Sequence, residues 1–223
     1  MHTQTWQNAT PFARGAPADA TLTDAPRLPS LALDKVRLSY AAGEVIYVEG
    51  DLRQSLYAVL SGAVRTVRHT IDGRRQIGGF YYRGDIFGLE DGDEHGFTAE
   101  AISATEVTTH RLSASSTVNS ADPILVAAAM GELCRVRGHL AMLGRRCAGE
   151  KMASFLIDLA RRSDSDGASL PMSRQDIADY LGLALETVSR VLSQLQSEGL
   201  VSFATCRDFR IIRGAALKRL AES

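Results

Sequence analysis

The segment from Ser173 to Val201 restricts the possible fold more than any other part of this 223-residue chain. It reads SRQDIADYLGLALETVSRVLSQLQSEGLV. Ala178 is small where two helices would cross closely, and Gly182 follows four residues later, where a tight turn needs a left-handed backbone. Apolar residues for a shared core recur at helical spacing: Ile177, Leu181, Leu183, Val188 and Val191. This combination predicts a helix-turn-helix.

The ends of the two helices carry unequal signals. Ser173 can cap the first helix, and Asp176 lies in its first turn, where a negative charge suits the helix dipole. The second helix lacks such a cap, because Ala184 stands where Ser or Thr would contribute about 1 kcal/mol. The following sequence, GLVSFATCRDFRIIR, predicts a β-wing over residues 199–213.

In a helix-turn-helix the second helix enters the DNA major groove with its N-terminal residues toward the base edges. The four residues at those positions are Leu185, Glu186, Ser189 and Arg190. Arg190 can donate two bonds to guanine and Glu186 can accept from cytosine, while Ser189 is adaptable and Leu185 suits a thymine methyl. The alternative is that Glu186 and Arg190, four residues apart, form only a surface salt bridge.

Further polar residues are candidates for contacts with the phosphate backbone, which position a protein without specifying sequence. They are Ser173, Arg174, Gln175, Thr187, Arg207 and Arg210, with Arg213 as an additional candidate. The charge distribution has the matching sign. Residues 1–130 carry a net charge of −4 and residues 131–223 one of +3, within a total of −1.

A different pattern covers residues 31–112, where short β-prone segments alternate with regularly placed glycines. These are Gly43, Gly50, Gly62, Gly73 and Gly84, at intervals of 7, 12, 11 and 11 residues. Regular turns between strands of alternating polarity predict a small antiparallel barrel or jelly roll. Asp72-Gly73 is a hairpin signal within it.

A long helix is expected from about Asp122 to Cys147, with a break at Gly149 before a further helix over 150–162. Its apolar residues follow three heptads, at Val126, Ala129, Leu133, Val136, Leu140, Leu143 and Cys147. This narrow stripe favours a partner helix, and hence a parallel homodimer. Two alternatives stay open: the helix could pack on its own domain, and Cys147 could form an intersubunit disulfide rather than act as a small hydrophobe.

The composition indicates an ordinary globular chain, with 45% hydrophobic and 23% charged residues. No apolar run is long enough to span a bilayer and no secretion signal is expected, so the predicted location is cytoplasmic and no membrane partner is expected. Three widely spaced cysteines argue against a disulfide framework or a metal site. No nucleophile–base pair or phosphate-cradling loop indicates an enzyme, and residues 90–94, EDGDE, are interpreted as an acidic surface loop.

The predicted fold is therefore α+β, in four parts. Residues 1–30 form a flexible N-terminal arm, and residues 31–117 a double-stranded β-helix or jelly-roll sensor domain. Residues 118–149 form a long dimerisation helix, and residues 150–223 a C-terminal winged helix-turn-helix.

This order of parts resembles the CRP/FNR family of transcription regulators over nearly the whole chain from Leu31. GEVIYVEGD and LYAVLSGAVR look like the sensor strands of that family, and ETVSR, residues 186–190, matches the E-x-x-S-R motif of its FNR branch. SRQDIADYLGLALETVSR looks closest to the FixK class. The resemblance implies a dimeric regulator that binds TTGA-type palindromes in double-stranded DNA. It also implies an activator that contacts RNA polymerase and controls genes for low-oxygen respiration or nitrogen fixation.

Departures from the family concern the signal. The chain has no cysteine before Cys134, which argues against an iron–sulfur cluster, and Phe97 stands where cyclic-AMP binders carry a phosphate-neutralising arginine. His95 is a candidate haem ligand, although a loop histidine is more often solvated. We therefore expect no cofactor and no small-molecule effector. The alternative is a ligand-responsive sensor or repressor of the same family, and Cys206 in the wing is a candidate for redox control.

Overall fold

The computed structural model describes residues 36–112, 123–162 and 167–223, so the arm expected over residues 1–30 lies outside them. The N-terminal strands are β1 (Arg37–Tyr40), β2 (Val45–Tyr47), β3 (Ser55–Ser61), β4 (Ala63–His69), β5 (Arg75–Tyr82), β6 (Ile86–Phe87), β7 (Thr98–Ala101) and β8 (Thr105–Arg111). The remaining elements are α1 (Pro123–Leu143), α2 (Ala148–Arg161), β9 (Ala168–Ser169), α3 (Arg174–Leu181), α4 (Leu185–Ser197), β10 (Val201–Phe203), β11 (Asp208–Ile211) and α5 (Gly214–Glu222).

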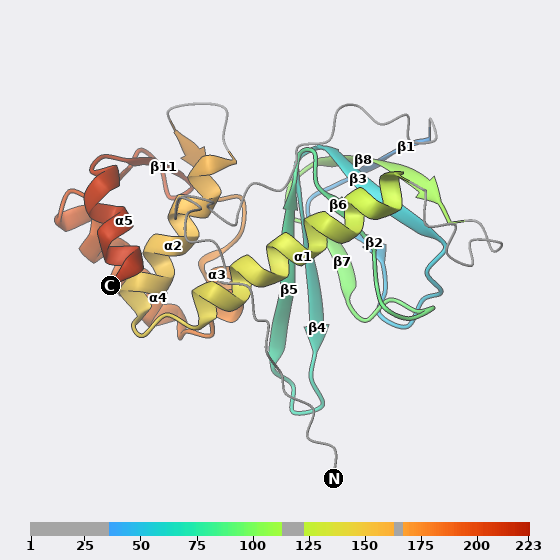
Figure 1. Cartoon of the computed structure of the whole chain (residues 1–223), viewed down its shortest axis with the longest axis horizontal. Coiled ribbons are helices and arrows are strands. Elements are labelled where there is room, and N and C mark those ends of the chain that lie inside the picture. The colour runs from blue at the N-terminus through green and yellow to red at the C-terminus, as the bar shows by residue number, and fades with distance from the viewer. Residues whose placement is uncertain (1–35, 113–122, 163–166) are drawn as a thin grey trace, which may run out of the picture.

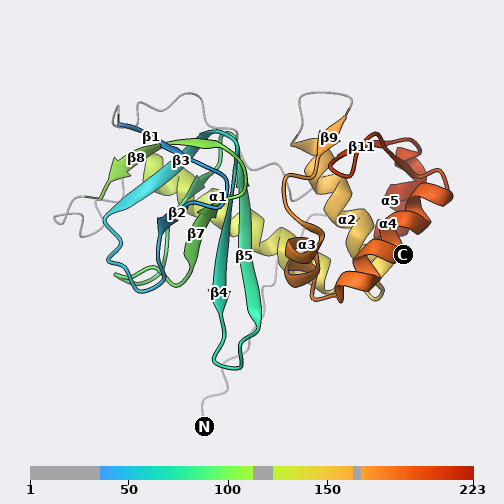
Figure 2. The same cartoon turned by 180° about the vertical axis from the view of Figure 1, so that it is seen from behind.

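The eight N-terminal strands form a β-roll of two antiparallel four-stranded sheets, in the orders β1-β8-β3-β6 and β2-β7-β4-β5. Between the sheets lies a buried cluster that includes Tyr47, Val64, Tyr81, Phe87 and Val107. The jelly-roll prediction is confirmed. The β4–β5 hairpin reaches well beyond the rest of the roll (Figures 1 and 2).

Two glycines show why the interval pattern predicted turns. Gly73, at the end of the β4–β5 hairpin, has a φ of +80°, a conformation that residues with a side chain rarely adopt. Gly62 has a φ of +83°, and a Cβ there would lie 2.4 Å from the Ala104 carbonyl oxygen. Backbone conformation and close approach therefore both require glycine at position 62.

Helix α1 runs from the β-roll to the C-terminal domain (Figure 1). It ends at Leu143, so the expectation of one helix reaching Cys147 is wrong, as is the break at Gly149, which lies inside α2. We call the predicted heptad stripe of α1 the seam. Cys147 is the exposed N-cap residue of α2 and so is not the seventh residue of this seam. The physical reason is the Glu150 carboxylate, which accepts hydrogen bonds from the Arg146 N–H at 3.0 Å and from Cys147 Sγ at 3.3 Å. These bonds cap the first turn of α2, so a new helix begins there.

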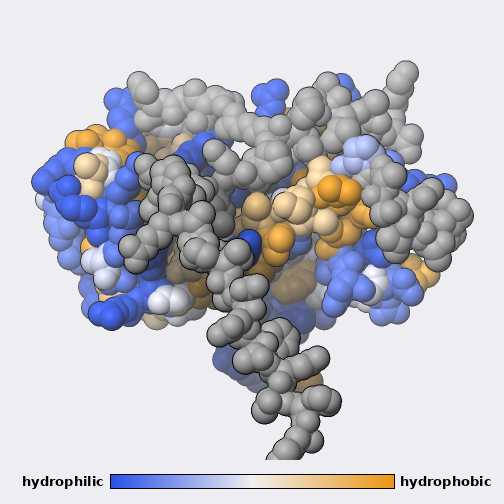
Figure 3. Space-filling view, in the orientation of Figure 1, coloured by the Kyte–Doolittle hydropathy of each residue, from blue (hydrophilic) through white to orange (hydrophobic). Residues whose placement is uncertain are grey.

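The other six seam residues lie together on the exposed side of α1. They are Val126, Ala129, Leu133, Val136, Leu140 and Leu143. The opposite side of the helix buries Ile124, Ala128 and Met142. The helix thus packs on its own domain through Ile124 and Ala128, as the alternative expected, but the seam takes no part in that packing. Figure 3 shows an apolar strip running over α1.

The C-terminal residues fold as the predicted winged helix-turn-helix. Ala178 and Ile177 of α3 are fully buried against α4, and Gly182 between the helices has a φ of +62°. Strands β10 and β11 pair antiparallel to form the wing, and β9 adds to its edge. Within the described residues, no helix combines the length and apolar character needed to cross a bilayer.

The β-roll and the winged domain share a hydrophobic core. Val67, Ile77 and Phe80, on β4 and β5, belong to the same buried cluster as Ile177 and Tyr180 of α3. The Phe80 and Tyr180 rings lie 5.0 Å apart at a tilt of 59°. Helix α3 is therefore packed against the β4–β5 hairpin.

Candidate nucleic-acid interface

The first turn of α3 is built around a capping box. The Ser173 hydroxyl accepts from the Asp176 N–H at 3.0 Å, and the Asp176 carboxylate accepts from the Ser173 N–H at 3.0 Å. The predicted cap and the predicted place of Asp176 are confirmed. The Ser173 hydroxyl also donates to Asp176 at 2.8 Å, so a phosphate contact through this hydroxyl would have to replace that bond.

The next two residues point outward. Arg174 and Gln175 are exposed, and Arg174 forms no hydrogen bond or ion pair with the described residues. Gln175 donates to Asp179 at 2.7 Å across one turn. Arg174 is thus a free cation at the start of α3, as a phosphate contact requires.

Helix α4 presents one polar face and buries the other. Val188, Val191, Leu192 and Leu195 are buried. Glu186 and Arg190 are exposed, Leu185 is 39% exposed, and Ser189 and Thr187 are half-buried.

No ion pair joins Glu186 and Arg190 in the part of the chain that the structure describes, so the surface salt bridge is not formed. Their carboxylate and guanidinium groups are free to meet base edges. Ala184 is the N-cap residue and makes no side-chain bond, as predicted.

The wing carries the remaining predicted contacts. The Thr205 hydroxyl donates to Asp208 at 2.7 Å and thereby braces the turn between β10 and β11. Arg207, Arg210 and Cys206 are all exposed on this hairpin. The geometry therefore offers cations at the start of α3, on α4 and on the wing.

Several aromatic rings pack together in the interior of the β-roll. Tyr47 stacks on His95 at 3.6 Å between ring centroids, and Phe87 lies 5.2 Å from both Tyr57 and Tyr81. His95 is buried, so its interpretation as a solvated loop residue is wrong. Burial lowers the pKa of His95 below its ordinary 6.5.

Phe97 occupies a tight site on the same roll. A Cβ on Gly78 of β5 would lie 2.8 Å from the Phe97 ring, and the Arg68 guanidinium stacks over that ring at 4.9 Å. The Phe97 ring therefore packs between Gly78 and the Arg68 guanidinium.

The loop over residues 90–94 is largely exposed, as expected. Arg53 donates to the Gly92 carbonyl oxygen at 3.0 Å and so ties the loop to the roll. Among the described residues, no group of three or more His, Cys, Asp or Glu side chains could hold a metal ion.

Comparison with known proteins agrees with this arrangement. The model of the cyclic nucleotide-binding domain matches residues 37–118, and that of the Crp-like helix-turn-helix domain matches residues 150–220. The nitrogen fixation regulation protein FixK of Rhizobium meliloti is 42% identical over 183 residues, which cover 82% of this chain and 85% of the relative. The FixK of Azorhizobium caulinodans is 39% identical over 94% of this chain and 87% of its own length.

The chain belongs to the CRP/FNR family. The structure of FixK2 from Bradyrhizobium japonicum is similar with a TM-score of 0.75 and 42% identity, covering 83% of this chain and 96% of that one. A CRP/FNR family regulator from Thermus thermophilus is 25% identical with a TM-score of 0.65, covering 84% and 99%. The predicted resemblance is confirmed, and the chain is a DNA-binding transcription regulator of this family.

Sequence reasoning missed one set of charged residues in this CRP/FNR protein. Asp176 is not only a cap but also the partner of Arg65 and Arg75 on the β-roll, and Asp179 is a second partner of Arg75. Burial raises the pKa of Asp176, but the bonds from Ser173 and the two guanidinium groups outweigh it and hold the pKa below 3.8. Two carboxylates on the same side of α3 were the available signal, but their partners lie about a hundred residues away.

Proposed function

We propose that this protein is a homodimeric, sequence-specific transcription activator that recognises a palindrome of TTGA-type half-sites. The observation that carries this proposal is the outer face of α4, where Glu186 and Arg190 are exposed and unpaired over a buried core. An unpaired arginine at this place can donate two bonds to guanine, and the carboxylate can accept from cytosine.

The seam of α1 supports the homodimer. Five of its six residues are large hydrophobic side chains that the chain itself leaves exposed. A two-fold axis along the seam would present two copies of α4, and dimeric helix-turn-helix proteins read half-sites about 34–36 Å apart. The same two-fold axis would thus bury the seam and place the two recognition helices as a pair.

The packing of the β-roll supports activity without a small-molecule effector. Tyr47 packs its ring against those of Phe87 and His95 in the interior, and Phe97 stands where the resemblance places the phosphate-neutralising arginine of cyclic-AMP binders. The FixK relatives are named nitrogen fixation regulation proteins. We therefore infer control of genes for nitrogen fixation or low-oxygen respiration, through contact with RNA polymerase.

A second candidate is a ligand-responsive regulator of the same family. The match of the cyclic nucleotide-binding domain model to residues 37–118 favours it. Calorimetric titration with cyclic AMP and cyclic GMP separates the two candidates. We expect no heat of binding, and micromolar binding of either nucleotide would favour the second candidate.

The main test is selection of bound duplexes from a random DNA pool by the purified protein, with and without reductant. We expect palindromes of TTGA-type half-sites in the reduced arm. A recovered set without symmetry or base preference would contradict the proposal. Loss of selection only without reductant, restored in Cys206→Ser, would indicate control through the exposed thiol of the wing.

Two single variants then separate base contacts from phosphate contacts. Arg190→Ala is expected to cost about 1–3 kcal/mol per half-site and to relax the preference at one G·C pair. Arg174→Ala is expected to weaken specific and random DNA alike and to lower the salt dependence of binding. Equal loss on both kinds of DNA for Arg190→Ala would contradict base recognition by this arginine.

A further inference from the structure

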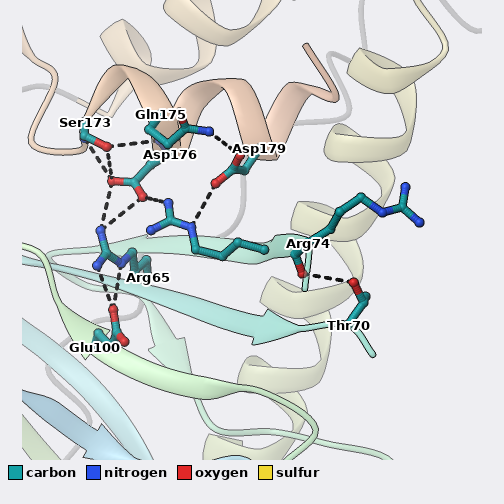
Figure 4. Close-up of polar contacts among 9 residues, drawn as sticks. Arg65, Thr70, Arg74, Glu100, Ser173, Gln175, Asp176 and Asp179 are labelled. Atoms are coloured by element: carbon teal, nitrogen blue, oxygen red, sulfur yellow. Dashed lines mark hydrogen bonds and ion pairs between the residues drawn. The ribbon is translucent and has the colours of Figure 1, made fainter. Parts of the chain in front are cut away.

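The inward side of α3 carries a buried carboxylate that is held by the β-roll (Figure 4). Asp176 is 0% exposed, although a charged side chain is almost never fully buried without partners. It accepts from Arg65 Nη1 at 2.9 and 3.1 Å and pairs with Arg75 Nη2. Two of its partners therefore belong to another domain.

The two arginines come from neighbouring strands. Arg65 lies on β4 and Arg75 on β5, and Arg65 is itself fixed by Glu100 of β7 through bonds of 2.9 and 2.7 Å. Arg75 Nε also donates to Asp179 at 2.8 Å. We call Arg65, Arg75, Glu100, Asp176 and Asp179 the ionic clamp.

The ionic clamp fixes α3 at two points. Asp176 and Asp179 are three residues apart, so they lie on the same side of the helix, about one turn from each other. Bonds at both points restrict rotation of the helix about its axis as well as sliding along it. Because each bond is directional, the clamp allows few orientations of α3 on the hairpin.

The apolar part of the interface does not impose this restriction. Phe80 and Tyr180 contribute attraction, but hydrophobic contact is non-directional and tolerates small shifts. A buried ion pair contributes little net stability, because removing the charges from water offsets most of the attraction. The clamp therefore selects an orientation rather than supplying most of the docking energy.

The clamped turn is also the turn that faces DNA in the proposed function. Asp176 points inward to the β-roll, while Arg174 and Gln175 of the same turn are exposed. Helix α4 packs directly on α3 through Ala178, Leu181 and Val188. Whatever fixes α3 also fixes the base-reading face of α4.

We propose that Arg65 and Arg75 are positioning residues for DNA recognition, which hold the recognition unit in its binding orientation on the β4–β5 hairpin. This inference rests on the proposed function, since it concerns how two recognition helices are held at one spacing. Charged side chains of the β-roll then hold the DNA-binding domain in the orientation that a bound effector would otherwise impose.

The test compares Arg65→Gln and Arg75→Gln with Arg74→Gln. Arg74 is the matched control, because it neighbours Arg75 and carries the same charge, but its side chain is 83% exposed and, among the described residues, its ion pair is with Asp72, two positions away. The probes are a duplex with two inverted TTGA half-sites, about one helical turn between their centres, and duplexes with two base pairs added or removed between the half-sites.

We expect Arg75→Gln and Arg65→Gln to bind the correctly spaced duplex about 10-fold more weakly, because only a fraction of the dimers has both units in place. We also expect the penalty for altered spacing to shrink, because freed units can adapt to other separations. Arg74→Gln is expected to match the wild type in both measurements, which excludes a mere loss of charge. Lower stability alone would not change the spacing penalty of the folded protein.

The outcomes separate this inference from the proposed function. A wild type indifferent to half-site sequence and spacing would overturn the proposed function. A selective wild type whose Arg65→Gln and Arg75→Gln variants keep both affinity and spacing penalty would overturn the ionic clamp alone. If either variant fails to fold by circular dichroism, Asp179→Asn removes one point only, and we expect a roughly 3-fold loss with a smaller spacing penalty. An unchanged Asp179→Asn would then count against the clamp.

Discussion

Leu140 offers the sharpest test of the dimer, because the chain leaves it 63% exposed, the most of any large side chain in the α1 seam. Complete burial of a leucine contributes about 1.5–3 kcal/mol. Burying the exposed part in both chains of a dimer therefore contributes roughly 2–4 kcal/mol. Leu140→Ala removes most of that contact, so the dimer dissociation constant is expected to rise about 20- to 500-fold.

The assay is analytical ultracentrifugation over a range of concentrations, with operator binding measured on the same samples. Leu52→Ala is the matched control, because Leu52 is 65% exposed but lies on the β-roll, away from α1. The two variants lose the same atoms from side chains of nearly equal exposure. Only Leu140→Ala is expected to shift the sedimentation profile toward the monomer and to lose DNA affinity with dilution.

Two results would refute the reasoning. If both variants remain dimeric with the wild-type dissociation constant, the seam is not the interface. If Leu140→Ala lowers the free energy of unfolding of the monomer, the side chain stabilises its own chain and the exposed seam is misinterpreted. Urea unfolding at a concentration where the protein is monomeric measures this second quantity.

Two further predictions concern the stability of the folded chain. Burial against Tyr180 lowers the pKa of His139 below 6.5, so the unfolded chain binds a proton more readily than the folded one. The free energy of unfolding should therefore fall as the pH decreases below 6.5, with a flatter slope for His139→Gln than for the exposed control His69→Gln in urea titrations. Ala184→Ser should give α4 its missing cap and stabilise the protein by about 1 kcal/mol, seen as a melting temperature roughly 2–4 °C higher, whereas Ala204→Ser in the wing turn should leave it unchanged.

The parts of the fold that the sequence predicts are those fixed by neighbouring residues. Ala178 and Gly182 specify a close helix crossing and a left-handed turn within five positions, and both features are present. The same holds for Gly73 and the hairpin that it closes. Local backbone constraints of this kind need no knowledge of distant contacts.

The end of α1 could not be predicted, because heptad spacing continues through Cys147 while the helix does not. The deciding contact is the Glu150 carboxylate on the Arg146 N–H, a competing cap that hydrophobic periodicity does not record. The burial of His95 could not be predicted from the sequence for a different reason. Its burial depends on stacking against Tyr47, which lies on β2, far earlier in the chain, and no local pattern distinguishes a stacked histidine from a solvated one.

The packed β-roll and the ionic clamp both bear on how the DNA-binding domain is oriented when no ligand is bound. A ligand shifts an equilibrium between orientations only by its differential affinity for them, so a regulator without a ligand must carry that difference in its own contacts. The rings of Tyr47 and Phe87 pack together within the roll, and the buried cluster to which they belong does not reach α3. The strands β4 and β5 connect the roll to α3. There the apolar contacts supply attraction, and the directional bonds to Asp176 restrict the orientation of the helix. On this proposal, a packed β-roll without the clamp would give a stable sensor domain but a loosely oriented DNA-binding domain. A relative whose activity depends on a ligand is therefore expected to lack both the packed rings and the ionic clamp.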